Sequence, residues 1–84
     1  MKYRLLYTSR AVKDVERLET QIRQRIGKTL LRYAEDPLKY ATNLTESRLG
    51  TYRFRIGHYR VIFDLDDDKI VILRVGHRRD IYKR

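Results

Sequence analysis

Cysteine is missing from the 84-residue sequence, and so are long apolar runs, repeats and low-complexity tracts. Without cysteine the chain can hold neither a disulfide framework nor a zinc site of the cysteine type. This composition fits a reducing compartment, and we expect a cytoplasmic protein. The first residues do not form a secretory signal, and no stretch approaches the ~20 apolar residues that span a bilayer.

Motifs for metals, cofactors and nucleophiles are also missing. The two histidines, His58 and His77, have no third ligand at a suitable spacing. Residues 66–68 are consecutive aspartates, but they lack the length of a calcium loop and predict an exposed hairpin turn. There is no Gly-rich phosphate loop and no serine or cysteine nucleophile motif. We therefore expect neither a metal ion nor a cofactor.

The positive charge is large for such a short chain. Lysine and arginine number 20 against 11 acidic residues, which gives a net charge of +9 and a pI of about 10.2. This excess points to a polyanionic partner: a nucleic acid, an acidic protein segment or an anionic membrane surface. Solubility alone requires charged residues but not an excess of positive over negative charge. A membrane role would need a free amphipathic helix, whereas the long helical pattern here is better used as core.

Hydrophobic periodicity predicts one domain over residues 1–84, beginning with a strand and two helices. Residues 3–8 alternate as a strand does, and Thr8 or Ser9 can cap the helix that follows. An apolar stripe with helical spacing then runs to about residue 35, and we expect it to pack on a sheet. A break near Glu19-Thr20 would divide it into a helical hairpin. The stripe consists of Val12, Val15, Leu18, Ile22, Ile26 and Leu30.

The last third of the chain predicts an antiparallel meander. Asp36-Pro37 should end the helical region, and residues 38–50 are expected to form a loop. The fold class is therefore α+β: an N-terminal strand, a helical hairpin and a three-stranded antiparallel meander in two layers. The helices should cover one face of the sheet and leave the other open as a groove. The meander strands are expected at residues 51–56, 59–65 and 70–75.

Three arginines should meet on the open face. If Gly57-His58 is a two-residue turn, Arg55 lies directly opposite Arg60, with Arg53 on the same face. Like charges directly opposite each other destabilise a sheet, and a protein accepts this cost most readily where an anion will sit. Arginine suits phosphate because its planar fork donates two parallel hydrogen bonds.

A different interpretation is that Asp64 or Asp66 neutralises these arginines. The C-terminal segment favours the anion site, because it adds a histidine, two arginines and a tyrosine just after the last strand. If it turns back over the open face, it completes the groups needed to cut RNA without a metal. A base would activate a ribose 2′-hydroxyl, arginines would stabilise the phosphorane and an acid would protonate the leaving 5′-oxygen. The four residues are His77, Arg78, Arg79 and Tyr82.

Two blocks of the sequence resemble the RelE/ParE superfamily of toxins, specifically its RelE branch. The blocks are YRFRIGHYRVIF at residues 52–63 and VGHRRDIY at residues 75–82, and the resemblance covers essentially the whole chain. It implies the toxin of a type II toxin–antitoxin system that cuts messenger RNA in the ribosomal A site. The cut needs no metal and leaves a 2′,3′-cyclic phosphate. The resemblance also implies a RelB-like antitoxin in a hetero-oligomer, and no membrane.

The resemblance assigns roles to individual residues. Arg60 would stabilise the transition state, Arg78 would stabilise phosphate or act as the acid, and Tyr82 would stack on the substrate base. Arginine is a poor proton acceptor, so His77 or, more weakly, Glu46 is expected to be the general base. The spacing between Arg78 and Tyr82 is shorter than in the best-known member. The expected RNA-binding residues are Arg53, Arg55, Arg60, Arg78, Arg79 and Tyr82; the expected catalytic residues are Arg53, Arg55, Arg60, His77, Arg78, Tyr82 and Glu46.

Other functions fit the same sequence. A ParE-like toxin would poison DNA gyrase on this fold without RNA chemistry. A degenerate member would keep only antitoxin binding, and a standalone module would only bind RNA. The arginine cluster together with His77 and Tyr82 favours the ribonuclease.

Overall fold

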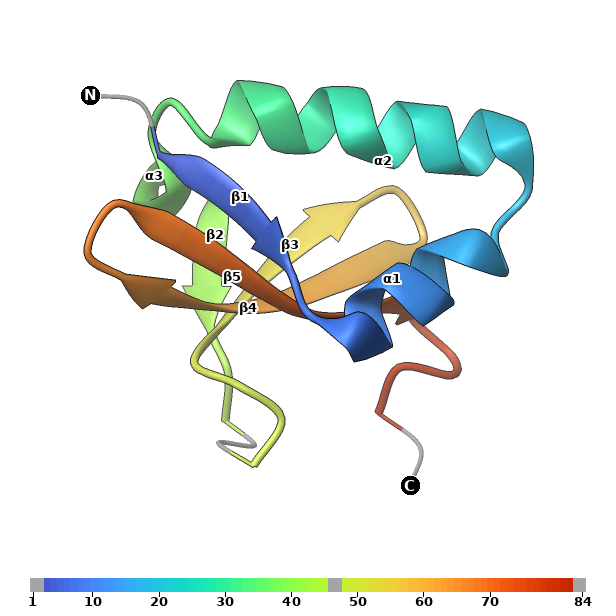
Figure 1. The fold of residues 1–84 in the computed structure, drawn as a ribbon. Helices are drawn as coiled ribbons and strands as arrows, with labels where there is room; N and C mark the ends of the chain where they lie inside the picture. The colour runs from blue at the N-terminus through green and yellow to red at the C-terminus, as the bar shows by residue number, and fades with distance from the viewer. Residues whose placement is uncertain (1–2, 46–47, 83–84) are drawn as a thin grey trace.

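The computed structural model describes residues 3–45 and 48–82, which form a five-stranded sheet with helices on one side (Figure 1). The strand order is β1-β5-β4-β3-β2; β1 runs parallel to β5, and the other neighbours are antiparallel. This confirms the α+β class with an N-terminal strand, a helical hairpin and a meander. The elements are β1 (Arg4–Tyr7), α1 (Ser9–Glu16), α2 (Thr20–Tyr33), α3 (Pro37–Tyr40), β2 (Ala41–Asn43), β3 (Tyr52–Ile56), β4 (Tyr59–Asp66) and β5 (Lys69–His77).

The helical hairpin forms where the sequence predicts it. Thr8 is the N-cap of α1, and its Oγ1 accepts a hydrogen bond from the Ala11 N–H at 3.1 Å. The chain leaves the helix after Glu16 and enters α2 at Thr20, so the predicted break is confirmed. The helices carry the chain from β1, at one edge of the sheet, to β2 at the opposite edge.

The apolar stripe is correct for α2 but wrong at the start of α1. Ile26 and Leu30 are buried, whereas Val12 is 42% exposed and Ala11 is fully buried instead. The inward face of α1 passes through positions 11, 14 and 15, because the break before α2 lets the two helices turn their faces independently.

The segment expected as a loop at residues 38–50 contains two further elements, which corrects that expectation. The helix α2 ends at Tyr33, before Asp36-Pro37, but Pro37 then opens the short helix α3, where its missing N–H costs no hydrogen bond. Strand β2 then pairs antiparallel with β3 and adds a fifth strand at the edge. A three-residue strand is too short for alternation to reveal it.

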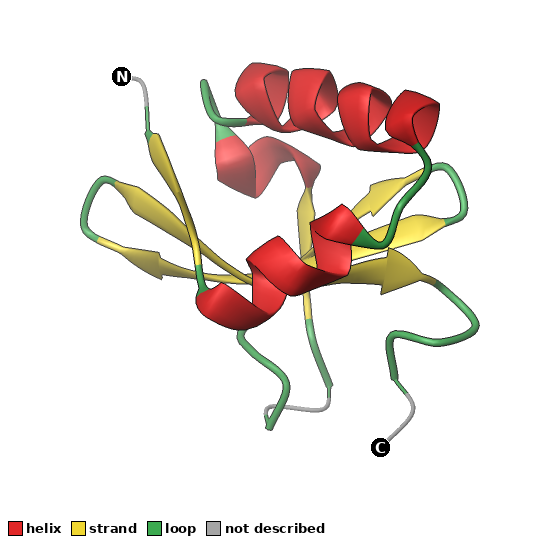
Figure 2. Ribbon diagram, turned by 45° about the vertical axis from the view of Figure 1, so that its right-hand side comes forward, coloured by secondary structure: helices red, strands yellow, loops and turns green. Residues whose placement is uncertain are grey.

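The helices cover one face of the sheet, and Figure 2 shows α2 lying across it. The β2–β3 loop and the C-terminal segment lie on the opposite side in both ribbon views. The opposite face is therefore only partly open. Ile62 is buried there, and an ideal Cβ on Gly50 would come within 2.7 Å of its Cγ2. The main core, under the helices, consists of Ala11, Ile26, Leu30, Ala34, Phe54, Ile56, Val61, Phe63, Ile70, Ile72 and Val75.

A bulge in β5 changes which residues face the helices. Ile62 pairs with Arg74 and Phe63 with Ile72, so Leu73 is an extra residue in the ladder. The alternation shifts by one position at this point, and Val75 becomes a core residue.

Candidate functional site

The β3–β4 hairpin places arginines side by side on the face away from the helices. Ile56 pairs with Tyr59, so the turn has two residues, and Gly57 adopts a φ of +60° that favours glycine. Arg55 and Arg60 are direct register partners, as the sequence predicts. Both lie on the face of the sheet opposite to the one that carries the core residues of the same strands.

Arg60 and Asp14 are the buried charged residues among those described. Arg60 is only 9% exposed, and its Nη1 donates to the backbone oxygens of Gly57 at 3.0 Å and Tyr59 at 2.9 Å. Burial lowers the pKa of its guanidinium, and the positive charge of Arg55 lowers that pKa further. The charges of Arg53 and Arg78 act in the same direction, while Tyr82 opposes them.

No acidic side chain among residues 3–45 and 48–82 forms an ion pair with Arg60, Arg53 or Arg55. Asp64 instead accepts a hydrogen bond from the Thr51 N–H at 2.8 Å. Neutralisation by a nearby aspartate is therefore not what the structure shows. A buried charge is normally paired, but none of the described acidic residues compensates this cluster.

Arg53, on the same face, has a side-chain donor without an acceptor. Its Nη1 donates to the Tyr82 hydroxyl at 2.9 Å, but its buried Nε has no hydrogen-bond partner in the described structure. An unsatisfied buried N–H is costly, and an oxygen of a bound phosphate is the kind of acceptor that would satisfy it.

The C-terminal segment turns back toward the arginines, as the sequence suggests. Tyr82 contacts Arg53, and Arg78 is close enough to influence Arg60 electrostatically. Arg79 lies apart from them, because it lines a pocket with Tyr59 and other residues at the end of β5.

His77 also lies apart from the arginine cluster. It is the register partner of Tyr59, whose side chain packs against the helix-covered core, and the two rings meet edge to face at 5.4 Å. His77 Nδ1 accepts the Arg79 N–H at 3.1 Å. A second pocket places His77 beside Tyr59 and Leu18, which lies in the link between α1 and α2. The structure therefore does not bring His77 together with Arg60, contrary to the expectation of one shared groove.

The remaining predicted residue, Glu46, lies outside the described residues. Among those described, no group of three or more His, Cys, Asp or Glu side chains could hold a metal ion. No described helix is long and apolar enough to cross a membrane.

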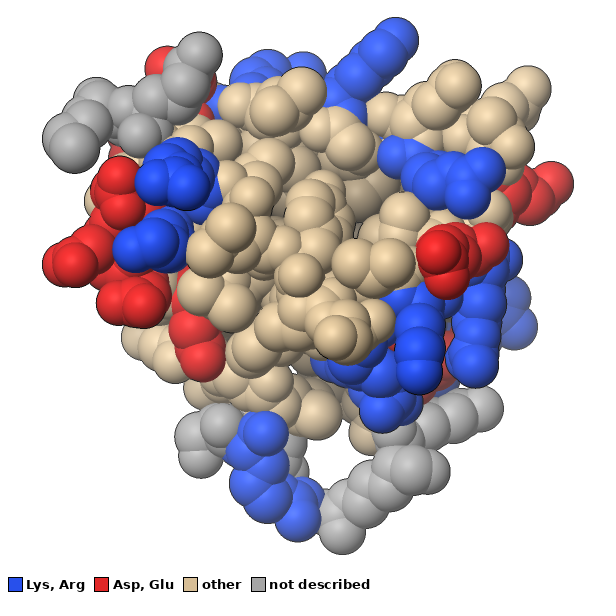
Figure 3. Space-filling view, in the orientation of Figure 1, with Lys and Arg blue, Asp and Glu red and all other residues tan. Residues whose placement is uncertain are grey.

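Figure 3 shows acidic side chains gathered at the left of the view, over the β4–β5 turn, and basic side chains at the lower right, over α1.

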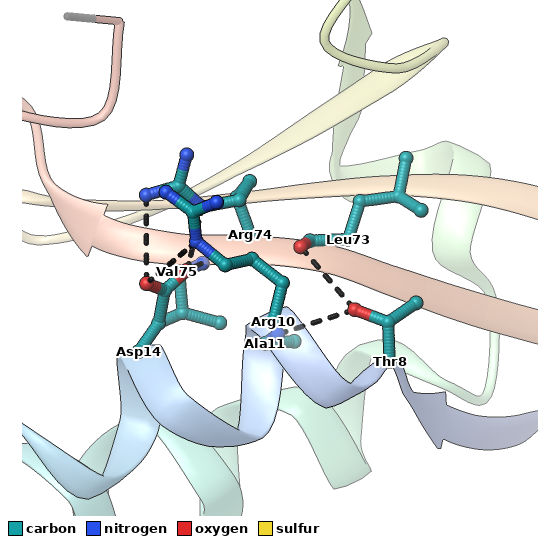
Figure 4. A network of polar contacts seen from close by, with 7 residues as sticks. All are labelled: Thr8, Arg10, Ala11, Asp14, Leu73, Arg74 and Val75. Atoms are coloured by element: carbon teal, nitrogen blue, oxygen red, sulfur yellow. Dashed lines mark hydrogen bonds and ion pairs between the residues drawn. The ribbon is translucent and has the colours of Figure 1, made fainter. Parts of the chain in front are cut away.

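Asp14 is a structurally important residue that the sequence analysis missed. Its buried carboxylate accepts hydrogen bonds from Arg74 Nε at 2.7 Å and from the Val75 N–H at 3.0 Å (Figure 4). It thereby ties α1 to the part of β5 that leads into the C-terminal segment. Its position three residues after the buried Ala11 on α1 could have revealed that it faces inward.

Comparisons with known proteins agree with this geometry. The family model described as the ParE toxin of the type II toxin-antitoxin system parDE matches residues 5–82. The toxin RelG of Mycobacterium tuberculosis is 33% identical over 87 residues and covers 100% of both chains. The toxin RelE3 of Methanocaldococcus jannaschii is 30% identical over 84 residues and covers 94% of each.

A solved structure shares the fold closely. The crystal structure of the toxin–antitoxin complex RelBE2 from Mycobacterium tuberculosis contains a chain with a TM-score of 0.83 and 30% identity, covering 93% of this chain and 100% of that one. The present chain belongs to the RelE/ParE family of toxins of type II toxin–antitoxin systems. The family resemblance found in the sequence is thus confirmed.

Proposed function

We propose that this toxin is a ribosome-dependent endoribonuclease that cuts messenger RNA without a metal ion and so inhibits translation. The observation that carries the proposal is the buried Arg60 guanidinium, which has arginine neighbours and no acidic partner among the described residues. A phosphate of the RNA backbone supplies the compensating negative charge. The named toxins among its relatives belong to the RelE group, which favours RNA as the target.

In the proposed reaction the ribose 2′-oxygen attacks the adjacent phosphorus after losing its proton to a base. A phosphorane forms, the bond from phosphorus to the 5′-oxygen breaks, and that oxygen takes a proton. The products are a 2′,3′-cyclic phosphate and a free 5′-hydroxyl. Negative charge on the phosphorane oxygens rises during the attack, so fixed guanidinium groups stabilise the transition state more than the substrate.

The arginines divide this work. Arg60 is held by two backbone carbonyls through Nη1 alone, which fixes its position and leaves Nε and Nη2 to face the phosphate. Arg53, whose Nη1 donates to the Tyr82 hydroxyl, adds positive charge near Arg60. Arg55 adds charge from the same hairpin face, and Arg78 serves as phosphate stabiliser or acid. Tyr82, 39% exposed, offers its ring to an unpaired base.

The general base is proposed to be Glu46 rather than His77. The ring of His77 lies with Tyr59, away from Arg60, and its Nδ1 already accepts a backbone N–H. A base must come within hydrogen-bond reach of the 2′-hydroxyl. The arginines would hold the RNA, and with it this hydroxyl, on the face of the sheet away from the helices.

A cognate antitoxin of the RelB type is the proposed partner, in a toxin–antitoxin hetero-oligomer. The similar toxin of Mycobacterium tuberculosis was solved in such a complex. A partly disordered, acidic partner could cover the basic surface by folding on it. We place the toxin in the cytoplasm, where ribosomes translate.

Poisoning of DNA gyrase is the second candidate, because the matching family model describes ParE toxins. The arginine face would then bind DNA or gyrase and perform no RNA chemistry. A catalytically inactive member that only binds antitoxin is a further outcome of the test below.

The deciding experiment is induced expression of the wild type and of Arg60→Ala, with primer extension on a reporter mRNA. We expect discrete cuts in the wild type that disappear in the variant and when translation is blocked. Lys28→Gln is the matched control, because it removes one positive charge from the exposed surface of α2, away from the site. Circular dichroism of both purified variants confirms that they fold.

Each outcome selects one function. Translation-dependent cuts that need Arg60 support the ribonuclease. Growth arrest with DNA damage signalling and no cuts would make the protein a gyrase poison. The absence of both effects would leave a member that only binds its antitoxin.

A further inference from the structure

The segment after β5 is held in a tight turn of its own. The N–H groups of Asp80 and Ile81 both donate to the His77 carbonyl, at 2.8 and 3.0 Å, and the Arg79 N–H donates to the His77 ring. In addition, the Arg78 N–H donates to the His58 carbonyl in the β3–β4 turn at 2.8 Å. These bonds reverse the chain and direct it back along the sheet.

Ile81 anchors this turn to the sheet. It is only 1% exposed, although it directly precedes the last described residue. An ideal Cβ on Gly76 would come within 3.3 Å of the Ile81 Cδ1 and 3.9 Å of its Cβ. Gly76 is the register partner of Arg60, so the side chain of Ile81 occupies the space beside Arg60, on the arginine face. Glycine inside a β-strand often marks such a close approach.

Tyr82 is placed by this anchor. Among the described residues its side chain makes one hydrogen bond, in which Arg53 Nη1 donates to the Tyr82 hydroxyl at 2.9 Å in a solvent-exposed position. One exposed hydrogen bond is too weak to offset the entropy of ordering a segment of several residues. Burial of the Ile81 side chain supplies the larger stabilisation.

We propose that Ile81, seated on Gly76, is a positioning residue that holds Tyr82 against the arginine cluster for catalysis. This inference rests on the proposed RNA cleavage. Ile81 touches no substrate itself. Its loss leaves Arg53, Arg55 and Arg60 in place on the hairpin, so RNA still binds, but the tyrosine no longer meets the base in a fixed position. Small misplacements of this kind cost rate far more than affinity.

The first test compares Ile81→Ala with Ile70→Ala in single-turnover cleavage on programmed ribosomes. Both variants remove the same atoms from a buried isoleucine, but Ile70 belongs to the core under the helices. At a temperature where both are folded, we expect Ile81→Ala to lower the maximal rate by about 10- to 100-fold with less than about a threefold change in affinity. Ile70→Ala should keep the wild-type rate. If either alanine variant fails to fold, the two valine variants replace them.

A second test uses the contact from the other side. Gly76→Ala places a methyl group against the Ile81 Cδ1, and Ile81→Val lacks that atom. We expect Gly76→Ala to lower the rate and the double variant Gly76→Ala/Ile81→Val to recover it to the level of Ile81→Val alone. A double variant as slow as Gly76→Ala would overturn the proposed contact.

Amide hydrogen exchange separates this inference from the proposed function. In Ile81→Ala the amides of Asp80 and Ile81 should exchange at least tenfold faster, whereas amides of α2 should not change. Unchanged exchange, or a folded Ile81→Ala with the wild-type rate, contradicts the anchor while leaving RNA cleavage intact. A wild type that never cuts RNA contradicts the proposed function, and the exchange result still decides whether Ile81 holds the segment.

Discussion

Replacing Arg55 by glutamine should make the protein more stable and less active. Arg55 and Arg60 are direct partners across the β3–β4 ladder, and Arg60 is buried without an acidic partner in the described structure. Like charges directly opposite each other cost roughly 0.2–1 kcal/mol. Replacing Arg55, the exposed residue of the pair, should raise the free energy of unfolding by this amount. The gain corresponds to a rise in Tm of up to about 4–8 °C for a domain of this size.

Urea unfolding at low and high salt, followed by circular dichroism, measures this effect. The gain in the free energy of unfolding should be largest at low salt and should shrink at about 1 M salt, where the Debye length falls to about 3 Å. Binding of a single-stranded oligoribonucleotide should weaken in the same variant. Lys28→Gln, which removes a charge from α2, should change neither quantity appreciably.

A less stable Arg55→Gln at low salt, or a gain that salt does not diminish, would refute the reasoning. Either result would mean that the two guanidinium groups do not repel each other in the free protein. The arginine pair would then be ordinary surface charge, and the case for a preformed phosphate site would lose its energetic basis.

Three further predictions follow from the site and its supports. Asp14→Ala should destabilise the fold by about 3–5 kcal/mol, because it leaves Arg74 partly buried without its carboxylate, and thermal unfolding against Asp14→Asn measures how much the charge contributes. His77→Ala should lower the single-turnover rate less than tenfold, whereas Glu46→Ala should lower it about 100-fold; the reverse order in a rapid-quench assay would identify His77 as the base. RNA affinity should fall with salt at a slope of about −0.7 for each phosphate contact, and Arg60→Ala should reduce the slope by one such contact in fluorescence titrations; a slope near zero would exclude a phosphate-binding face.

The arginine pair could be predicted from the sequence because its geometry is local. A two-residue turn at Gly57-His58 fixes the register of the strands on either side, and strand alternation then decides which side chains share a face. No distant contact is needed to place Arg55 opposite Arg60. The same local logic gave the Thr8 cap and the break before α2.

The positions of Asp14 and His77 could not be derived in this way. The bulge at Leu73 shifts the alternation of β5, and it is visible only in the pairing with β4. This shift makes Val75 a core residue, exposes its N–H to Asp14 of α1 and turns His77 to the side of Tyr59. The prediction that His77 joins the arginine cluster was wrong, because it rested on closeness in sequence to Arg78 and Arg79.

The sequence by itself determined the family, the order of the main elements and the arginine face of the hairpin, since these depend on composition, periodicity and a turn of two residues. The tertiary structure alone decided the edge strand β2, the bulge in β5 and the seat of Ile81 on Gly76. Each of these joins segments that are held by packing and strand pairing rather than by local preference. Such contacts exist only once the sheet and its two sides are assembled.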